Sequence, residues 1–331
     1  MSNSITKIID TITPEIYNAY MQQYTAEKSA FVQSGIAVTD GRVSKNITDG
    51  GLLVNMPFWN DLSGDDEVLT DGDKALETGK ITAGKQVAAV LYRGRAWSVN
   101  ELAAITSGDD PMGALMNRIA DYWVRREQAV LISTLNGLFD STSGCLKDTH
   151  MLDISGGSGA AAKISSNAIL DTKQLLGDAA DRITAIALHS AVYTELQKQQ
   201  LIEFIPDANN PNIRIPYYLG YRIAAIDDNL PKSGSGTNAV YTTYLFGSGS
   251  IGRNEGNPSD LTTFETDREK LKGNDLVITR RAMVFHPYGC KYEDQVCTDV
   301  TPSNTELANA TNWTKVYEDK NIGLLALKHK I

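Results

Sequence analysis

The chain has 331 residues, of which 31 are basic and 40 acidic, and its formal net charge is −9. This acidic balance excludes a general nucleic-acid binder, which needs a basic surface to displace counterions. No apolar run approaches the ~18 residues that span a bilayer, so we expect no membrane partner. The length suggests about two domains.

The first residues and the cysteines favour a protein made in a cytoplasm. Met1–Lys7 lacks the basic start and the apolar stretch of a signal peptide. Cys145, Cys290 and Cys297 form no CxxC pair, and such a sparse, odd set is typical of reduced thiols. No two of the four histidines have metal-ligand spacing, so we expect neither a metal nor a cofactor.

The N-terminal part is predicted to be an arm over residues 1–51. A helix is expected over Pro14–Ala30, because Ile16, Tyr20 and Tyr24 are spaced for one helical face. After Gly35 the chain becomes polar and rich in glycine, which is typical of an arm rather than a compact domain.

Two predicted strands follow, Leu52–Trp59 and Lys85–Val99. They flank Asn60–Gly84, a segment with little apolar content. Loops longer than ~12–15 residues are uncommon inside compact domains and are usually functional or disordered. We therefore predict a two-stranded extended loop over residues 52–99 with an acidic tip. Its acidic residues are Asp61, Asp65, Asp66, Glu67, Asp71, Asp73 and Glu77.

A long helix is predicted over Pro111–Phe139. Asp109-Asp110 supplies a cap and Pro111 suits the first helical position. Apolar residues then recur at helical spacing. At 1.5 Å per residue the helix would be a rod of roughly 43 Å, with Arg125-Arg126 as a basic middle section.

Helices and strands alternate after the flexible link Ser155–Gly159. A capping box of Ser303 and Glu306 predicts a further short helix near the C-terminus. The expected helices are Asn167–Gly177 and Ser190–Leu201, the latter with Ser190 as its cap. The expected strands are Arg182–Leu188, Tyr218–Ile226, Ala239–Phe246 and Asp275–His286.

One motif points to nucleotide chemistry. Gly247–Gly252 matches G-x-G-x-x-G after a predicted strand. In a dinucleotide site the third glycine opens a helix, but Arg253–Pro258 cannot continue one. We favour a glycine-rich turn. A nucleotide-dependent enzyme that uses this loop stays as the alternative from a different functional class.

The other chemically suggestive residues have structural explanations. His189 and Ser190 are adjacent and lack the G-x-S-x-G context of a nucleophile, so a helix cap explains them. His286 ends an apolar strand, and Arg280-Arg281 is typical of a solvated face. With no catalytic residue expected, an arm and a projecting loop favour an assembly subunit over an enzyme.

Short motifs along nearly the whole chain are similar, in order, to those of one family. They are Val54–Asp65, Ile81–Lys85, Arg93–Trp97, Ser107–Met112, Ala187–Tyr193, Leu219–Arg222 and Asn312–Tyr317. Each is modest alone, but the ordered set resembles the major capsid proteins of tailed bacteriophages.

The resemblance implies an α+β fold with an N-terminal arm, an extended β-hairpin loop, a peripheral domain with a long spine helix, and an axial domain. Mapped onto this chain, the arm is 1–51 and the extended loop 52–99. The peripheral domain is 100–164 with its spine helix at 111–139, the axial domain is 165–260, and 261–331 returns to the peripheral domain and forms the C-terminal tail.

The resemblance also implies a structural role. Copies would assemble through hexamers and pentamers into an icosahedral shell around phage double-stranded DNA, contacted non-specifically, in the host bacterial cytoplasm and then in the virion. Some members fuse an assembly-directing segment ahead of the arm, whereas few residues precede the loop here. We therefore expect a separate scaffolding protein, besides a portal and a decoration protein. The nearest alternative is an encapsulin-like nanocompartment shell.

We expect three contacts between copies. The acidic tip lies over a neighbouring subunit, the N-terminal helix braces a neighbour, and the axial loops around 247–257 meet at capsomer centres, where glycine permits close approach. The tip candidates are Asp65, Asp66, Glu67, Asp71 and Asp73. Their candidate partners are Arg93, Arg95, Arg125 and Arg126, and the axial candidates are Gly249 and Gly252.

Overall fold

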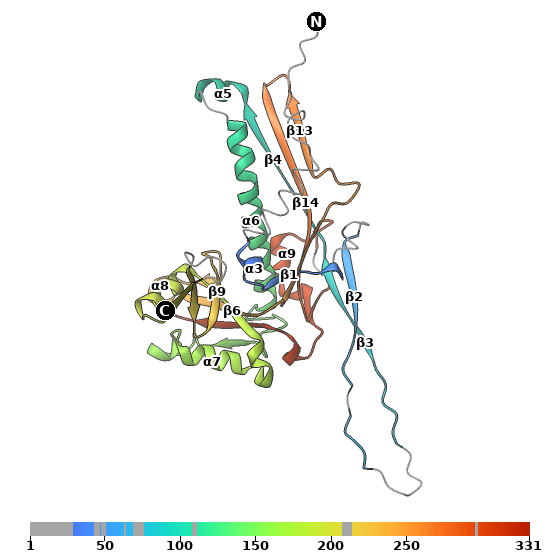
Figure 1. The fold of residues 1–331 in the computed structure, drawn as a ribbon, viewed down its shortest axis with the longest axis vertical. Coiled ribbons are helices and arrows are strands. Elements are labelled where there is room, and N and C mark those ends of the chain that lie inside the picture. Colours follow the sequence, from blue (N-terminus) through green and yellow to red (C-terminus); the bar gives the residue numbers. More distant parts are fainter. Residues whose placement is uncertain are drawn as a thin grey trace.

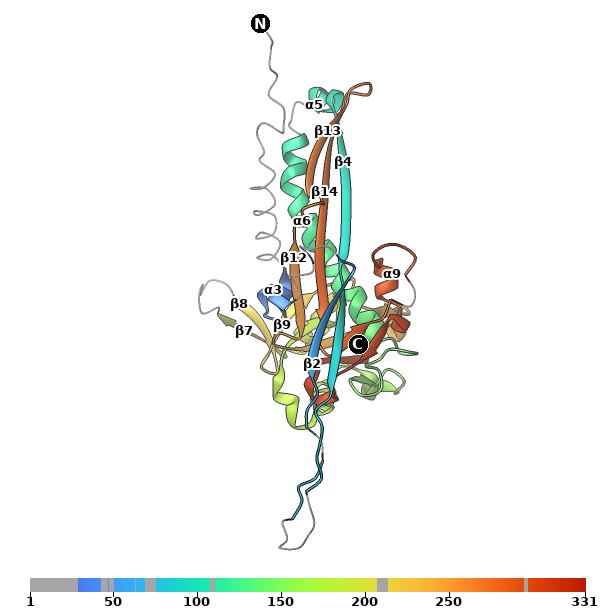
Figure 2. The same cartoon turned by 90° about the vertical axis from the view of Figure 1, so that its right-hand side faces the viewer.

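The computed structural model describes residues 29–331 except 43–46, 48–50, 63, 69–75, 108–110, 207–213 and 295–296. Residues 14–28 of the expected N-terminal helix, and the expected Asp109-Asp110 cap, lie outside the described residues. The fold is α+β, as expected. Figures 1 and 2 show an elongated body, an α/β unit beside one end of it, and a narrow hairpin that projects beyond both.

The elongated body is built on β14 (Asn274–Pro287), which pairs with strands on both of its edges. On one edge lie β13 (Phe264–Glu269) and β12 (Ile251–Gly256), one after the other along β14, and on the other edge lies β4 (Leu91–Asn100). The short β1 (Ala37–Thr39) adds in parallel to β12. Among the described residues these strands form one five-stranded sheet.

Helix α6 (Pro111–Leu138) runs along one face of this sheet (Figure 1). Its 28 residues confirm the predicted long helix, which ends one residue earlier than expected. Its buried face includes Ile119, Trp123, Leu131 and Leu135, and the Trp123 indole donates to Oγ1 of Thr279 on β14 at 3.2 Å. Apolar burial therefore holds the helix on the sheet.

Two short helices flank the ends of α6. Helix α5 (Glu101–Ser107) follows β4 at the far end of the body, and α9 (Asn304–Leu307) packs against the C-terminal part of α6. The predicted capping box of Ser303 and Glu306 is confirmed. Close packing at α9 requires glycine on α6, because a Cβ at Gly137 would lie 2.3 Å from the carbonyl oxygen of Leu307.

The α/β unit contains the larger sheet, with helices α7 (Ser166–Gln174) and α8 (Ser190–Lys198) beside it. Among the described residues the sheet has eight strands, and β10 (Lys232–Ser233) pairs with β11 outside the main path. The main path runs in the order β5 (Met151–Asp153), β17 (Leu324–His329), β11 (Val240–Gly247), β6 (Ile183–Leu188), β9 (Tyr221–Ile226), β8 (Arg214–Tyr218), β7 (Ile202–Pro206).

Two small ladders and several single turns complete the described structure. The projecting hairpin is β2 (Leu53–Trp59) with β3 (Ala83–Ala89), and β15 (Cys290–Tyr292) pairs with β16 (Trp313–Lys315). A four-residue helix, α3 (Ala30–Gln33), precedes β1. The 3-10 turns are η1 (Gly159–Ala162), η2 (Gly177–Arg182), η3 (Gly236–Asn238), η4 (Ala310–Asn312) and η5 (Asp319–Asn321).

Three predicted elements differ from the structure. The strand expected over Lys85–Val99 divides at Val90, because β3 pairs with β2 whereas β4 pairs with β14. The strand expected over Tyr218–Ile226 divides at Leu219–Gly220, whose φ values of 51° and 81° are those of a tight hairpin turn. Helix α8 is capped by His189 and not by Ser190, since Nδ1 of His189 accepts from the amide of Ala191.

Sheet pairing also places three segments differently from the expected divisions of the chain. Strand β4 belongs to the sheet of the body, so the two-stranded hairpin ends at residue 89 rather than 99. Strand β12, expected in the axial part, pairs with β14 of the body. Strand β17, expected to return to the peripheral part, pairs with β11 and β5 in the larger sheet.

Candidate functional site

The projecting hairpin carries the acidic residues that the sequence predicted to lie at its tip. Strands β2 and β3 pair in register from Leu53 with Ala89 to Trp59 with Ala83, and the chain continues beyond them (Figure 2). Asp65 and Asp66 are exposed, and Glu67 is half-buried and accepts from the amide of Glu77 at 2.9 Å. Asp71 and Asp73 lie outside the described residues. Asp65 and Asp66 therefore face solvent in the single chain.

Large apolar side chains are exposed on the same hairpin. Trp59, Leu62 and Val68 are 69%, 75% and 83% exposed, and Leu76 and Ile81 are also exposed. The sequence interpretation stressed the acids and missed these residues. Five large apolar side chains exposed on one projecting segment make that segment a candidate for contact with another molecule.

The base of the hairpin is fixed by polar contacts with the end of β14. Gln86 on β3 is buried, and its Oε1 accepts from the amide of Gly289 at 3.0 Å and lies 3.0 Å from Nε2 of His286. Its side-chain amide donates to the hydroxyl of Tyr317, whose ring meets that of Phe58 edge-on. Burial lowers the pKa of His286 to about 3, so this imidazole is neutral and Nε2–H donates to Gln86. These contacts set the direction in which the hairpin leaves the body.

The predicted basic partners lie on β4 and α6. Arg93 donates to the carbonyl of Pro302 and is half-buried, and its pKa is lowered by burial and by the charge of Arg126. Arg95, Arg125 and Arg126 are exposed, and none of the three forms an ion pair with an acidic residue in the described part of the chain. Arg95, Arg125 and Arg126 therefore carry positive charge that the described part of the chain does not neutralise by ion pairing.

The two glycines expected at capsomer centres make contacts within the chain, where Gly249 is half-buried and Gly252 is buried. The amide of Gly249 donates to the carbonyl of Gly35 at 2.8 Å. Gly252 is buried in β12, where a Cβ would lie 2.6 Å from the hydroxyl of Tyr288. Gly249 adopts a φ of 64° in a turn and Gly252 packs closely on Tyr288, and the expected role of both between copies stays a prediction. The nucleotide-site alternative also fails, because Gly252 lies in a strand and opens no helix.

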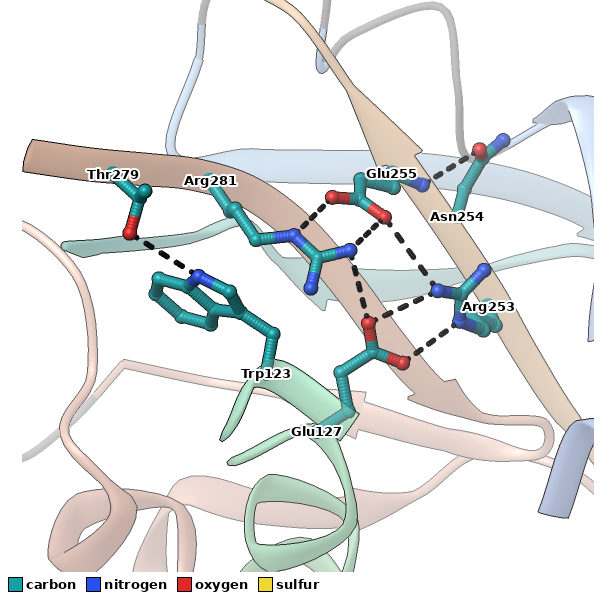
Figure 3. Close-up of polar contacts among 7 residues, drawn as sticks. All are labelled: Trp123, Glu127, Arg253, Asn254, Glu255, Thr279 and Arg281. Carbon is teal, nitrogen blue, oxygen red and sulfur yellow. Dashed lines mark hydrogen bonds and ion pairs between the residues drawn. The ribbon is translucent and has the colours of Figure 1, made fainter. Parts of the chain in front are cut away.

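A buried cluster of four charges joins α6 to the sheet (Figure 3). Glu127 on α6 accepts from Arg253 at 3.0 and 3.1 Å and lies 3.2 Å from Arg281. Glu255 pairs with both arginines, and the Arg281 guanidinium lies 5.4 Å from the ring centre of Trp123. All four charged side chains are less than a tenth exposed. Each charge is therefore compensated by its neighbours within the core.

The cluster corrects the expectation that Arg280-Arg281 is a solvated face. Arg280 does lie near the surface, where it pairs with Glu265 at 3.0 Å, but Arg281 points to the opposite face of β14 and is buried. Successive residues of a strand point to opposite faces, so adjacent arginines have different environments. A signal was present in the sequence, because Glu127 is an acid on the apolar stripe of a predicted helix.

A second exposed apolar surface lies at the far end of the body, where α5 meets the turn between β13 and β14 (Figure 2). Leu102 and Ile105 on α5 are 70% and 72% exposed, and Leu271 in the turn is fully exposed. Arg268 holds the two segments together through an ion pair with Glu101 at 2.6 Å. The sequence interpretation did not identify this surface.

The described residues show no arrangement for catalysis or metal binding. Ser190 donates to Asp228 and not to His189, whose Nδ1 is engaged as a helix cap. In the described part of the chain, no three His, Cys, Asp or Glu side chains gather where they could hold a metal ion. Within that same part, no helix combines the length and apolar character needed to cross a membrane.

Comparison with known proteins gives one strong sequence match. The major capsid protein of Bacillus phage SPP1 is 42% identical over 330 residues, which cover 98% of each chain. No protein-family model matches the chain.

Solved structures share the fold at low sequence identity. The capsid of Ralstonia phage GP4 superposes with a TM-score of 0.57 at 11% identity, over 92% of this chain and 91% of that chain. The capsid of cyanophage Pam1 gives a TM-score of 0.57 at 12% identity, over 92% and 93%. These matches agree with the expected α+β fold.

Proposed function

Because this chain belongs to the major capsid protein family of tailed bacteriophages and forms the shell of a phage head, we propose that its acidic hairpin joins neighbouring copies in that shell. The family is structural and non-enzymatic, and its place is the virion capsid. The proposed acceptor is the basic surface of Arg93, Arg95, Arg125 and Arg126 on β4 and α6 of the next copy.

One observation carries this proposal: a hairpin with a fixed base projects from the body with both acidic and large apolar side chains exposed. Solvent exposure of Trp59, Leu62 and Val68 is unfavourable in an isolated chain. Covering each of them would contribute on the order of 1.5–3 kcal/mol. The hairpin therefore has a physical reason to lie on another copy.

Charge complementarity supports the choice of acceptor. Asp65 and Asp66 are exposed on the hairpin, whereas Arg95, Arg125 and Arg126 are exposed on the body and unpaired among the described residues. Single exposed ion pairs contribute about 0–1 kcal/mol, so these pairs would mainly set orientation and partner choice. Apolar burial would supply most of the binding free energy. Because the contact repeats around the shell, the contributions of the ion pairs and of apolar burial would both be multiplied.

We also propose a larger assembly, which rests on the family membership of the chain. Copies would form hexamers and pentamers of an icosahedral shell around double-stranded DNA, with a separate scaffolding protein, a portal and a decoration protein as further partners. The net charge of −9 suits a container, because it limits adhesion of packaged DNA to the wall. The family membership decides against the nanocompartment alternative.

Charge reversal tests the proposed contact. The double variant Asp65→Lys with Asp66→Lys should lose closed shells, as should Arg125→Glu with Arg126→Glu, because each places like charges together. Combining the two pairs should restore shells, since opposite charges meet again. The protein is expressed with and without its neighbouring genes, and assembly is measured by sedimentation and electron microscopy. Normal shells from the Asp65 and Asp66 variant alone would contradict the proposal.

A further inference from the structure

The N-terminal arm contributes residues to the core at the base of the projecting hairpin. Strand β1 pairs with β12, and the amide of Asp40, the next residue, donates to the carbonyl of Arg253 at 3.3 Å. Further along the arm, Ile47 is fully buried in a core cluster shared with the hairpin and β14. The other buried members of this cluster are Val54, Met56, Ala88, Val90, Ala282 and Val284. The arm and the hairpin base therefore share one apolar core.

Ile47 also fits closely against β12. A Cβ at Gly256 would lie 2.5 Å from Cγ2 of Ile47, so glycine is needed there for the isoleucine to approach the strand. Burial of a side chain of this size is favourable, and its removal leaves a cavity. Lifting Ile47 from its place would therefore leave a cavity in the core that supports the hairpin.

A chain of polar and ring contacts leads from the same part of the arm to the hairpin. The hydroxyl of Tyr288 donates to Asp40, which also pairs with Arg42 at 2.7 Å. Hydrogen bonds from Arg42 and Tyr288 lower the pKa of Asp40 to about 2, so the carboxylate is charged and its hydrogen bonds are strong. The ring of Tyr288 meets that of His286 edge-on, with 5.9 Å between ring centres, and Nε2 of His286 lies 3.0 Å from Oε1 of Gln86 on β3. The arm is thereby connected to the hairpin through residues at the end of β14.

The contact between His286 and Gln86 cannot be rearranged without loss. His286 is fully buried, and its Nδ1 has no hydrogen-bond partner in the described part of the chain, so the imidazole depends on Gln86 for its hydrogen bonding. Oε1 of Gln86 also accepts from the amide of Gly289 at 3.0 Å. If β3 turned away from the body, these two buried donors would lose their acceptor, which is costly.

We propose that the arm segment carrying β1, Asp40 and Ile47, which we call the strap, locks the base of the hairpin onto the body. Ile47 supports the hairpin through the shared core. Asp40 holds Tyr288, whose ring steadies His286 beside the hairpin. A molecule that lifts the strap would therefore loosen the hairpin, and a loosened hairpin would weaken the strap, because coupling between two sites is reciprocal. The lock belongs to the single chain, whereas its consequence for the shell rests on the proposed function.

Amide hydrogen exchange of the full-length, unassembled protein tests the lock, because it measures the local opening of each element. Tyr288→Phe removes only the hydroxyl that binds Asp40. Loss of one hydrogen bond to a charged group should speed exchange in the strap by roughly tenfold or more. Exchange in β2 and β3 should rise several-fold with it, while exchange in β6 and β11 of the larger sheet should stay as in the wild type. Unchanged exchange in β2 and β3, or an equal rise in the larger sheet, would overturn the proposal.

Tyr244→Phe is the matched control, because it also removes a tyrosine hydroxyl that donates a hydrogen bond inside the protein. That bond goes to Oδ1 of Asn136 at 3.1 Å and joins the larger sheet to α6. Exchange in β2 and β3 should therefore stay at the wild-type rate in this variant. A rise as large as in Tyr288→Phe would show that any lost bond loosens the hairpin, and the strap would then have no special role.

Two further variants test the lock from the other side and through its apolar link. Gln86→Leu changes the hairpin end of the chain of contacts and should speed exchange in the strap, as reciprocal coupling requires. Ile47→Ala leaves the polar chain intact and should speed exchange in β2 and β3 through the cavity it creates. Wild-type exchange in the strap of Gln86→Leu, or in the hairpin of Ile47→Ala, would contradict the proposed lock.

Discussion

His286 and His329 are buried imidazoles that remain neutral in the folded chain. His286 lies 3.0 Å from Gln86 at the base of the hairpin, and Nε2 of His329 lies 2.8 Å from Oγ1 of Thr243 in the larger sheet. Burial lowers the pKa of His286 to about 3 and that of His329 to about 4. Both values lie below the ordinary histidine value of 6.5. Folding of this chain is therefore linked to pH.

We expect the free energy of unfolding of the unassembled protein to fall as the pH falls below 6.5. The unfolded chain takes up protons at these histidines before the folded chain does, so acid favours the unfolded state. Between pH 7 and pH 5, each of these two histidines should lower the free energy of unfolding by roughly 2 kcal/mol. Urea unfolding at both pH values measures the change. His286→Gln should reduce the pH dependence, and an unchanged dependence would contradict this account.

At the scale of single residues, the sequence predicted some environments and missed others. The capping box of Ser303 and Glu306 was predictable because both partners are three residues apart. The burial of Arg281 was not, since it depends on Trp123, Glu127 and Glu255, which only the folded chain brings to it. Local hydrogen bonds are visible in sequence, whereas long-range ion pairs are not.

At the scale of elements, the charge cluster determines where α6 lies on the sheet. Glu127 comes from α6, Arg253 and Glu255 from β12, and Arg281 from β14 (Figure 3). The apolar stripe of α6 alone would permit small shifts along the sheet. A shift of α6 would separate the buried charges from their partners, and an unpaired buried charge is costly.

Glu127→Gln should strongly destabilise the protein, because it leaves two buried arginines with one carboxylate. Removing one partner of a buried ion pair typically costs about 3–5 kcal/mol. Glu265→Gln is the matched control, since Glu265 pairs with the neighbouring Arg280 on the exposed side of β14. That variant should cost less than about 1 kcal/mol. Chemical denaturation of both variants measures the difference, and equal losses would show that the cluster has no special role.

The bounds of helices and strands were predicted best where the apolar spacing that defines them continues over many neighbouring residues. The apolar spacing after Pro111 predicted α6 to within one residue. The strand expected over Lys85–Val99 was one element in the sequence pattern but two in the structure, because its halves pair with different partners. Pairing between distant strands, such as β17 with β11, leaves no mark on either sequence alone.

At the scale of the whole molecule, exposed apolar side chains gather at opposite ends of the long axis. The hairpin carries Trp59, Leu62 and Val68 at one end, and α5 with the β13–β14 turn carries Ile105 and Leu271 at the other. The sequence predicted the acidic loop and its projection. It did not predict the second surface, because α5 and the turn become neighbours only through pairing of β4 and β13 with β14.

Ile105 and Leu271 are largely and fully exposed in the single chain, so replacing them should separate folding from assembly. Ile105→Asp with Leu271→Asp should leave the unfolding free energy of the unassembled protein within about 0.5 kcal/mol, as for most surface changes. Closed shells should be lost, because two charges would enter an apolar contact without partners. Leu271→Met is the control, since it keeps an apolar side chain of similar size and should assemble. Chemical denaturation measures the unfolding free energy, and sedimentation measures the yield of closed shells. Shells of normal yield from the aspartate variant would mean that this end stays in solvent, and that the hairpin end supplies the contacts between copies by itself.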